Sequence, residues 1–171
     1  MPIRRAVPAD LEEVGRITVG AYAPYLGGES DYVSELRDAA RRDREAELWV
    51  AVDDDDTLLG SVTACPEGSP WRELAQPGEG EFRTLAVEPP AQGRGVGRAL
   101  VEHVVARFRE AGATDVVLCS MSTMAPAHRL YQRLGFERDE ALDWSPVDGV
   151  HLIAYRLGLG PGSAPRRRPP G

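Results

Sequence analysis

Two short apolar segments on either side of an amphipathic helix constrain the fold of this chain most strongly. Residues 81–87 (EFRTLAV) predict a strand, and residues 115–121 (DVVLCSM) predict a second strand that is buried on both faces. Between them, apolar residues recur at helical spacing from Leu100 to Phe108, and Gly112 ends that helix. Because strand, helix and strand in this order form a parallel crossover, the sequence predicts an α/β fold.

The remaining segments complete one mixed, mostly antiparallel sheet with helices in a single domain. Apolar periodicity and turn residues predict a strand at 2–7, helices beginning at Asp10 and spanning about 31–44, a hairpin of strands 48–52 and 57–65, a loop over 66–80, a helix from Pro126 to Leu134, and strands at 136–142 and 150–157. We expect the domain to span residues 1–157. The low-complexity tail, residues 158–171, is expected to be disordered.

Composition excludes several functional classes. The formal net charge is −7 and every basic side chain is an arginine, so a lysine-dependent phosphate loop is excluded. An acidic body repels phosphate backbones, so we expect no nucleic-acid partner. No apolar run approaches the length of a membrane span, and the first residues lack a signal-peptide core, so a cytoplasmic location without membrane attachment is expected. The two cysteines are too few for a four-thiolate zinc site, and the histidines show no metal spacing, so no metal is expected.

A glycine-rich segment at the start of the central helix carries the clearest chemical signal. The run consists of Gln92, Gly93, Arg94, Gly95, Val96, Gly97 and Arg98. Glycines allow close approach of a ligand to the backbone, and a helix start leaves unpaired N–H groups next to the positive end of the macrodipole. Together these features predict a pyrophosphate site, to which two arginines add charge. The spacing differs from the dinucleotide fingerprint, and a plain connecting loop is the alternative interpretation.

A second motif, Leu130-Tyr131-Gln132-Arg133-Leu134-Gly135-Phe136, follows on the next helix. Taken together, Q-x-x-G-x-G at a helix start and L-Y-x-x-L-G-F resemble the GNAT superfamily of acyl-CoA-dependent N-acyltransferases. The resemblance covers nearly all of residues 2–157. It implies that the strands at 81–87 and 115–121 splay apart at a bulge and that acetyl-CoA enters the gap. It also implies cofactor contacts from the backbone of Leu85, Ala86 and Val87, from the amides of residues 92–98, and from Tyr131 beside the thioester.

The implied reaction is acetyl transfer to an amine by direct attack in a ternary complex. Tyr131 would then protonate the departing thiolate as a general acid. Glu81 is the first candidate for the general base and Glu79 the second, although water is able to take the proton instead. A bulge in the strand would reverse the side-chain alternation, so the sequence does not settle which face Glu81 occupies.

The sequence defines the residues that would bind the acceptor amine less clearly than those that would bind the cofactor. Met124 stands where the family often has an asparagine that orients the cofactor. Aromatic and acidic residues that suit an amine lie in the expected region: Tyr22, Tyr25, Tyr32, Trp71, Trp144, Glu29, Asp31 and Glu35. The acceptor is expected to be a small molecule or a peptide amine, and a homodimer is possible within such a family. The alternative functions are a non-catalytic acyl-CoA sensor and an acyltransferase that uses charged tRNA.

Overall fold

The computed structural model describes residues 1–28 and 30–160, and these form one eight-stranded sheet flanked by helices. The strands are β1 (Ile3–Arg5), β2 (Glu47–Val52), β3 (Leu58–Cys65), β4 (Gly80–Val87), β5 (Asp115–Met121), β6 (Glu137–Arg138), β7 (Trp144–Val147) and β8 (Val150–Gly158). Their order in the sheet is β1-β2-β3-β4-β5-β8-β6, and β7 also pairs with β8. The β4–β5 pair is parallel and the other pairs are antiparallel. The predicted α/β crossover is therefore confirmed.

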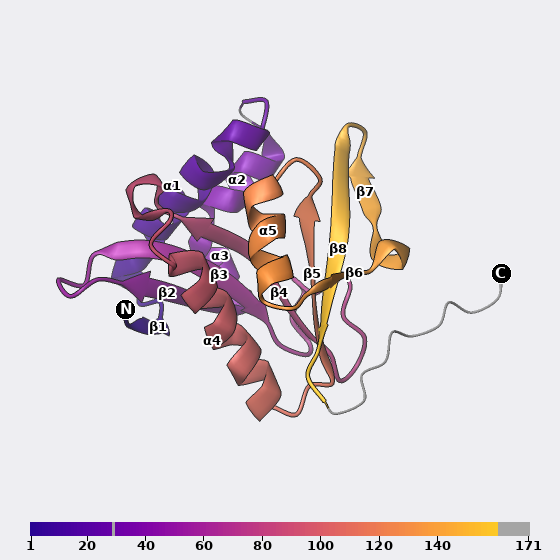
Figure 1. The fold of residues 1–171 in the computed structure, drawn as a ribbon. Coiled ribbons are helices and arrows are strands. Elements are labelled where there is room, and N and C mark those ends of the chain that lie inside the picture. Colours follow the sequence, from indigo (N-terminus) through magenta and orange to yellow (C-terminus); the bar gives the residue numbers. More distant parts are fainter. Residues whose placement is uncertain (29, 161–171) are drawn as a thin grey trace, which may run out of the picture.

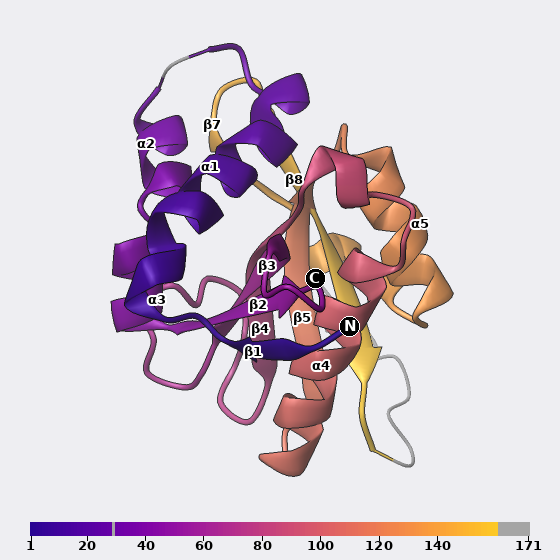
Figure 2. The same ribbon diagram turned by 90° about the vertical axis from the view of Figure 1, so that its left-hand side faces the viewer.

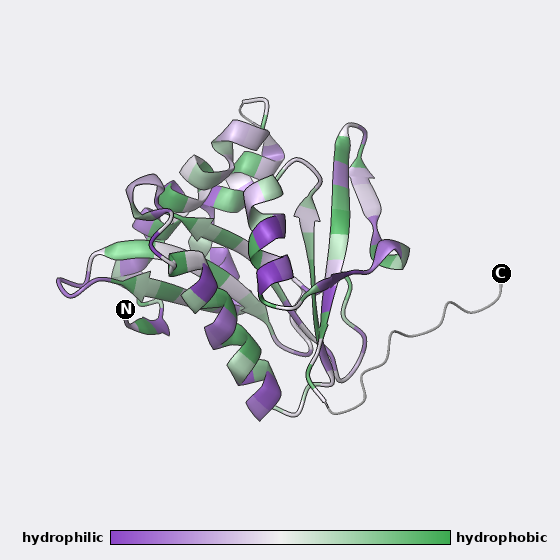
Figure 3. Cartoon of the chain, in the orientation of Figure 1, coloured by the Kyte–Doolittle hydropathy of each residue, from purple (hydrophilic) through white to green (hydrophobic). Residues whose placement is uncertain are grey.

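Helices cover both faces of the sheet (Figures 1 and 2). The α-helices are α1 (Leu11–Tyr22), α2 (Asp31–Arg37), α3 (Ala39–Glu45), α4 (Val96–Glu110) and α5 (Ala125–Arg133). In Figure 2, α1, α2 and α3 lie on one side of the sheet, and α4 and α5 lie on the other. Hydrophobic residues follow the strands in the interior, whereas α4 and α5 carry hydrophilic stretches on their outer surface (Figure 3).

The main core lies between the sheet and α4. Leu100, Val101 and Val104 of this helix are completely buried, and Val116 and Leu118 of β5 pack in the same cluster. This is the apolar stripe that the helical spacing predicts. The core fixes α4 against the sheet and so determines where the glycine-rich segment at its N-terminus lies.

The strands β4 and β5 separate after two paired positions. Gly80 pairs with Val116 and Glu81 pairs with Val117, and no pairing continues beyond them in the described part of the chain. On its other edge, β4 follows β3 with an extra residue between Arg83 and Ala86. This extra residue is a β-bulge. The separation predicted from the family resemblance is therefore present.

The bulge reverses the side-chain alternation along β4. Thr84, inside the bulge, has a positive φ of 56°, a conformation that a β-branched residue seldom adopts. Phe82 before the bulge and Leu85 after it both pack in the core on the α4 side. Glu81 and Arg83 consequently occupy the α1 face of the sheet, opposite to Leu85.

Two predicted elements differ from the structure. The helix expected over about 31–44 is two helices, because the backbone breaks at Asp38 and its carboxylate accepts the Arg41 N–H at 3.0 Å, which caps α3. The strand expected over 136–142 is only two residues long. Beyond it, the carboxylate of Asp143 accepts the Ala154 N–H at 2.8 Å, which turns the chain into the unpredicted strand β7.

The C-terminal boundary also lies slightly later than the sequence indicates. β8 runs to Gly158, and the Leu159 N–H donates to the Thr114 carbonyl at 2.9 Å. The rest of the predicted disordered tail, residues 161–171, lies outside the described residues, as does Glu29. Among the helices that the structure describes, none is long and apolar enough to cross a membrane.

Candidate functional site

The N-terminus of α4 presents a row of unpaired backbone amides. Within the described residues, the N–H groups of Gly93, Gly95, Val96, Gly97 and Arg98 donate to no acceptor, and the first bond of the helix runs from Ala99 to Gly95. Gly93 and Gly95 have φ values of 77° and 82°, which L-residues with a side chain rarely adopt. Five donors at the positive end of a helix form an anion-binding cradle.

The side chains around this cradle leave it open. A Cβ at Gly93 or Gly95 would meet no heavy atom within 4 Å, so both glycines border open space. Gly97 instead packs against α5, because a Cβ there would lie 3.2 Å from Leu130 Cδ2. Arg94 is exposed, and Arg98 donates to Glu102 on the same helix at 2.8 Å. The backbone therefore supplies most of the polarity of the cradle.

The predicted cofactor strand, Leu85 to Val87, leads from the gap toward this cradle. On its β3 side, Ala86 pairs with Ser61 and Val87 pairs with Gly60. Its other edge has no neighbouring strand there, since β5 pairs only as far as Glu81. Apart from the Val87 carbonyl, which accepts a long hydrogen bond from Gln92 Nε2 at 3.4 Å, backbone groups along that edge are consequently available to a ligand that lies in the gap.

Tyr131 reaches the gap from the α5 side of the sheet. It is only 5% exposed, and its ring lies within 6.0 Å of the rings of Phe82, Phe136 and Tyr155. Burial, reinforced by Cys119 and Tyr155, raises the pKa of its hydroxyl well above the ordinary value. Tyr131 therefore keeps its proton at neutral pH, as a general acid must.

On the opposite face, Arg83 and Cys119 flank the gap. Continuing the parallel register from Glu81 and Val117 places these two residues at facing positions on the separated strands. Burial raises the pKa of the Cys119 thiol to about 11, the charge of Glu73 adds to this effect, and Arg83 opposes it. A protonated thiol is a poor nucleophile, so Cys119 is a wall of the gap rather than an acyl carrier.

The carboxylate of Glu81, the first candidate for the base, is surrounded by backbone donors. It accepts the N–H groups of Glu73, Leu74 and Ala75 at 2.9–3.1 Å and is 2% exposed. Glu79 is similarly occupied, since it accepts the Gln76 N–H at 3.0 Å and pairs with Arg156 at 2.8 Å. Glu81 thus holds the 66–80 loop against β4, whereas Glu79, which lies in the loop, ties it to Arg156 of β8.

The loop held by Glu81 brings three side chains together beside the gap. Arg83 donates from Nη1 to the Trp71 carbonyl at 3.2 Å and to Glu73 Oε1 at 3.0 Å, and its guanidinium lies 5.1 Å from the Trp71 ring centre. Sequence reasoning missed Glu73 as a site residue. The loop has no periodicity to indicate its conformation, which depends on a buried carboxylate from another segment.

Met124, at the position of the usual asparagine, belongs to an apolar cluster. It packs with Tyr22, Leu36, Met121 and Leu152 at the far end of the gap. The cluster joins α1 and α2 to the strands β5 and β8, so the acceptor side of the gap has an apolar wall.

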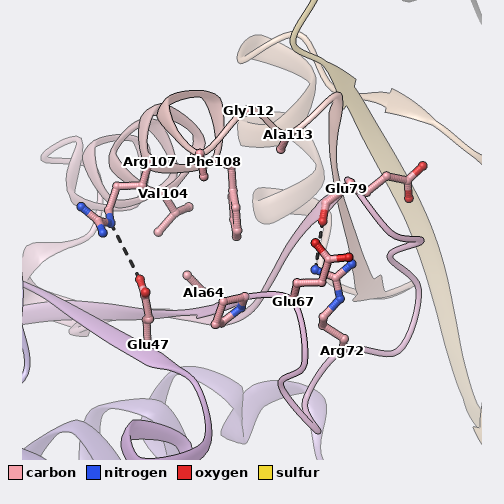
Figure 4. A pocket seen from close by; sticks show the side chains of 13 residues that line it. Glu47, Ala64, Glu67, Arg72, Glu79, Val104, Arg107, Phe108, Gly112 and Ala113 are labelled. Carbon is pink, nitrogen blue, oxygen red and sulfur yellow. Dashed lines mark hydrogen bonds and ion pairs between the residues drawn. The ribbon is translucent and has the colours of Figure 1, made fainter.

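A second hollow lies at the other end of α4 (Figure 4). This cavity of about 200 Å³ is lined by Val104 and Phe108, with charged residues at its rim. Both arginines of the rim have partners: Arg107 lies 3.7 Å from Glu47, and Arg72 donates to backbone carbonyls of the loop. The helix of 15 residues separates this hollow from the amide cradle by about 20 Å. We therefore place the site at the gap.

Nowhere in residues 1–28 or 30–160 do three or more His, Cys, Asp or Glu side chains gather to hold a metal.

Comparisons with known proteins point to one family. Residues 15–136 match the model of the family described as Acetyltransferase (GNAT) family. A mycothiol acetyltransferase of Cellulomonas flavigena is 31% identical over 175 aligned residues, which cover 88% of this chain and 47% of that protein. The chain thus spans about half the length of this relative.

Two solved structures are similar throughout. A putative acetyltransferase of the GNAT family from Desulfovibrio desulfuricans has a TM-score of 0.69 and 28% identity, covering 93% of this chain and 99% of that one. A GNAT family acetyltransferase from Brucella melitensis, solved in complex with acetyl-CoA, has a TM-score of 0.63 and 26% identity, with coverage of 94% and 88%.

Replacing Glu81 by glutamine tests its contacts with the loop. Glu81→Gln should lower the free energy of unfolding by about 1–3 kcal/mol, because three amides lose a charged acceptor. Hydrogen exchange at residues 73–75 should become faster. Glu67→Gln is the matched control, since Glu67 is exposed in the same loop and should change neither quantity. Unchanged exchange at residues 73–75 in Glu81→Gln would contradict the anchoring role.

Proposed function

The chain belongs to the acetyltransferase (GNAT) family, and we propose that it transfers an acetyl group from acetyl-CoA to the amine of an acceptor in a ternary complex. The observation that carries this proposal is the alignment of an open amide cradle, a separated strand pair and a buried tyrosine along one gap. The relative's name supports a small-molecule amine as the acceptor.

The residues along the gap fit acetyl-CoA. The unpaired amides of residues 93 and 95–98 would hold the diphosphate, and the exposed Arg94 would add charge to it. The free edge of β4 at Leu85 and Val87 would hydrogen bond to the amides of the pantetheine arm. In this arrangement the thioester would lie near the bulge, next to the ring of Tyr131.

The chemistry follows from three requirements. The acceptor nitrogen, once deprotonated, attacks the thioester carbonyl carbon, and the carbon–sulfur bond breaks. Backbone N–H groups at the bulge would stabilise the oxyanion that forms. The Tyr131 hydroxyl would donate its proton to the departing sulfur, and the nitrogen would lose its second proton to water as the neutral amide forms. Tyr131 would then regain a proton from solvent, so the protons balance.

For the base, we assign a positioning role to Glu81 and Glu79 in place of proton transfer. The carboxylate of Glu81 already accepts four hydrogen bonds from backbone amides, which leaves little room for a substrate amine. The amine proton would leave through water or through Glu73, whose Oε2 has no partner within the described residues. The cytoplasmic location and the homodimer stay predictions from the sequence.

Thiol release from acetyl-CoA in the presence of an amine panel tests this function. Release that depends on both the protein and an amine supports acetyl transfer. Binding of acetyl-CoA without release, measured by calorimetry on the same samples, would instead identify an acyl-CoA sensor. No binding at millimolar acetyl-CoA would overturn the assignment of the cradle.

A charge placed in the cradle should weaken binding more than a neutral group of the same size. Gly95→Asp should raise the Kd for acetyl-CoA about tenfold or more, because a carboxylate near a diphosphate costs over 1 kcal/mol even when partly screened. Gly95→Asn is the control, since asparagine also tolerates a positive φ. Calorimetry measures both, and equal Kd values for Asp and Asn variants would argue against a diphosphate at this position.

Removing the Tyr131 hydroxyl should slow turnover. Tyr131→Phe should lower kcat by about 10²–10⁴-fold while KM for acetyl-CoA changes little, because the hydroxyl acts on the leaving thiolate. Tyr155→Phe, in the same ring cluster, is the control and should keep wild-type kcat. Steady-state thiol release provides the measurement, and an unchanged kcat in Tyr131→Phe would remove this residue from the chemistry.

A further inference from the structure

Arg83 and Glu73 form an ion pair that uses only part of their hydrogen-bonding capacity. Arg83 donates to the protein from Nη1 alone: Nε is buried without an acceptor, and Nη2 meets none among the residues that the structure describes. On Glu73, Oε1 accepts from Arg83, and Oε2 has no partner in the same part of the chain. A cationic donor and an anionic acceptor are therefore available side by side.

The guanidinium is held rigidly. Two acceptors fix Nη1, and the Trp71 ring lies against the guanidinium carbon at 5.1 Å. Trp71 is itself buried and contacts Arg41 at 5.0 Å as well. A planar donor that is already ordered loses little side-chain entropy when it binds a planar anion such as a carboxylate.

The pair lies where an acceptor would enter. Arg83 precedes the bulge by one residue and faces Cys119 across the gap, on the side of the sheet covered by α1 and α2. The cradle and the start of α4 lie on the other side. Arg83 also acts electrostatically on Tyr32 of α2, whose pKa is raised by burial and lowered by this charge. An acceptor approaching the thioester from the α1 side therefore passes Arg83 and Glu73.

We propose that this pair selects an acceptor that carries a carboxylate next to its reactive amine, as a free α-amino acid does. The carboxylate binds Nη2 of Arg83, and the ammonium binds Oε2 of Glu73. Both groups of an amino acid sit on one carbon, a few ångströms apart, which matches the 3.0 Å spacing of the ion pair. The two charges of the amino acid and the charges of Arg83 and Glu73 then alternate in sign, so each charge lies next to an opposite one. This inference rests on the proposed acetyl transfer.

Binding also sets up proton removal. The ammonium transfers one proton to the Glu73 carboxylate or to water, and the nitrogen lone pair forms the new bond to the acetyl carbon. The carbon–sulfur bond breaks as the sulfur takes the proton of Tyr131. The nitrogen loses its second proton to water as the neutral amide forms, and Tyr131 regains a proton from solvent. The product is an N-acetyl amino acid whose nitrogen no longer carries charge. It loses its attraction to Glu73, which favours release.

Matched acceptors test the proposal on the wild-type protein. Each standard L-amino acid is assayed beside its decarboxylated amine and its carboxamide, with thiol release giving kcat/KM. The best amino acid should exceed both analogues by about 10- to 100-fold, the usual effect of a charge-assisted hydrogen bond. Equal or greater kcat/KM for the amines that lack a carboxylate would overturn the proposal.

Substitutions of Arg83 test whether this residue causes the preference for an acceptor with a carboxylate. Arg83→Gln should lower kcat/KM for the amino acid by about 10- to 100-fold and change the decarboxylated amine less than about threefold. Arg83→Lys should recover part of the preference, because it keeps the charge without the fork. Arg41→Gln, which removes the other arginine from the Trp71 ring, should leave both acceptors unaffected. Equal losses for both acceptors in Arg83→Gln would indicate a structural role only.

Calorimetry separates this proposal from acetyl transfer itself. Amino acids are titrated into the wild-type protein and Arg83→Gln, each saturated with coenzyme A. Binding that depends on Arg83, without any thiol release, would sustain the carboxylate site and overturn the proposed function. Release with amines alone, and no binding of amino acids, would do the reverse.

Discussion

The separation of β4 from β5 is the constraint on which the rest of the structure depends. A parallel pair normally continues along both strands, but here it ends after Glu81 and Val117. The bulge around Thr84 reverses the side-chain alternation of β4. The core residues Phe82 and Leu85 therefore both face α4, although they are three residues apart. Unpaired backbone edges inside a protein require partners, and this requirement supports the proposal that a ligand lies in the gap. The cradle, the buried tyrosine and the acceptor face all take their positions from it.

A second consequence of the bulge is that β4 contributes charged side chains to the acceptor face. Glu81 and Arg83 emerge there, and each organises a segment that has no regular secondary structure. Glu81 accepts hydrogen bonds from three backbone amides of the loop. The loop in turn places Trp71 and Glu73 within hydrogen-bond distance of Arg83. Several amide donors offset the cost of burying a carboxylate. The loop is therefore fixed against the strand without leaving an unpaired buried charge.

Sequence patterns predicted the parts of the fold that depend on local periodicity. The stripe from Leu100 to Phe108 places α4, and the two glycine motifs place the cradle and Tyr131. They could not predict the break at Asp38, because a single capping side chain decides it. Sequence patterns could not predict the conformation of the 66–80 loop either, since that conformation depends on a carboxylate on β4. The side of the sheet that Glu81 faces depended on one extra residue in the strand, which leaves no mark in the hydrophobic pattern.

The net charge of the whole chain proved a poor guide to the charge of the site. The gap combines the unpaired amides at the positive end of α4 with the partly used donors of Arg83. Electrostatic effects at a binding site fall off over a Debye length of about 10 Å, so near groups outweigh the sum over the surface. The proposed binding of a diphosphate on one side of the sheet and of a carboxylate on the other is therefore compatible with an acidic chain. The raised pKa of the buried Tyr131 hydroxyl means that this side chain adds no charge to the gap at neutral pH.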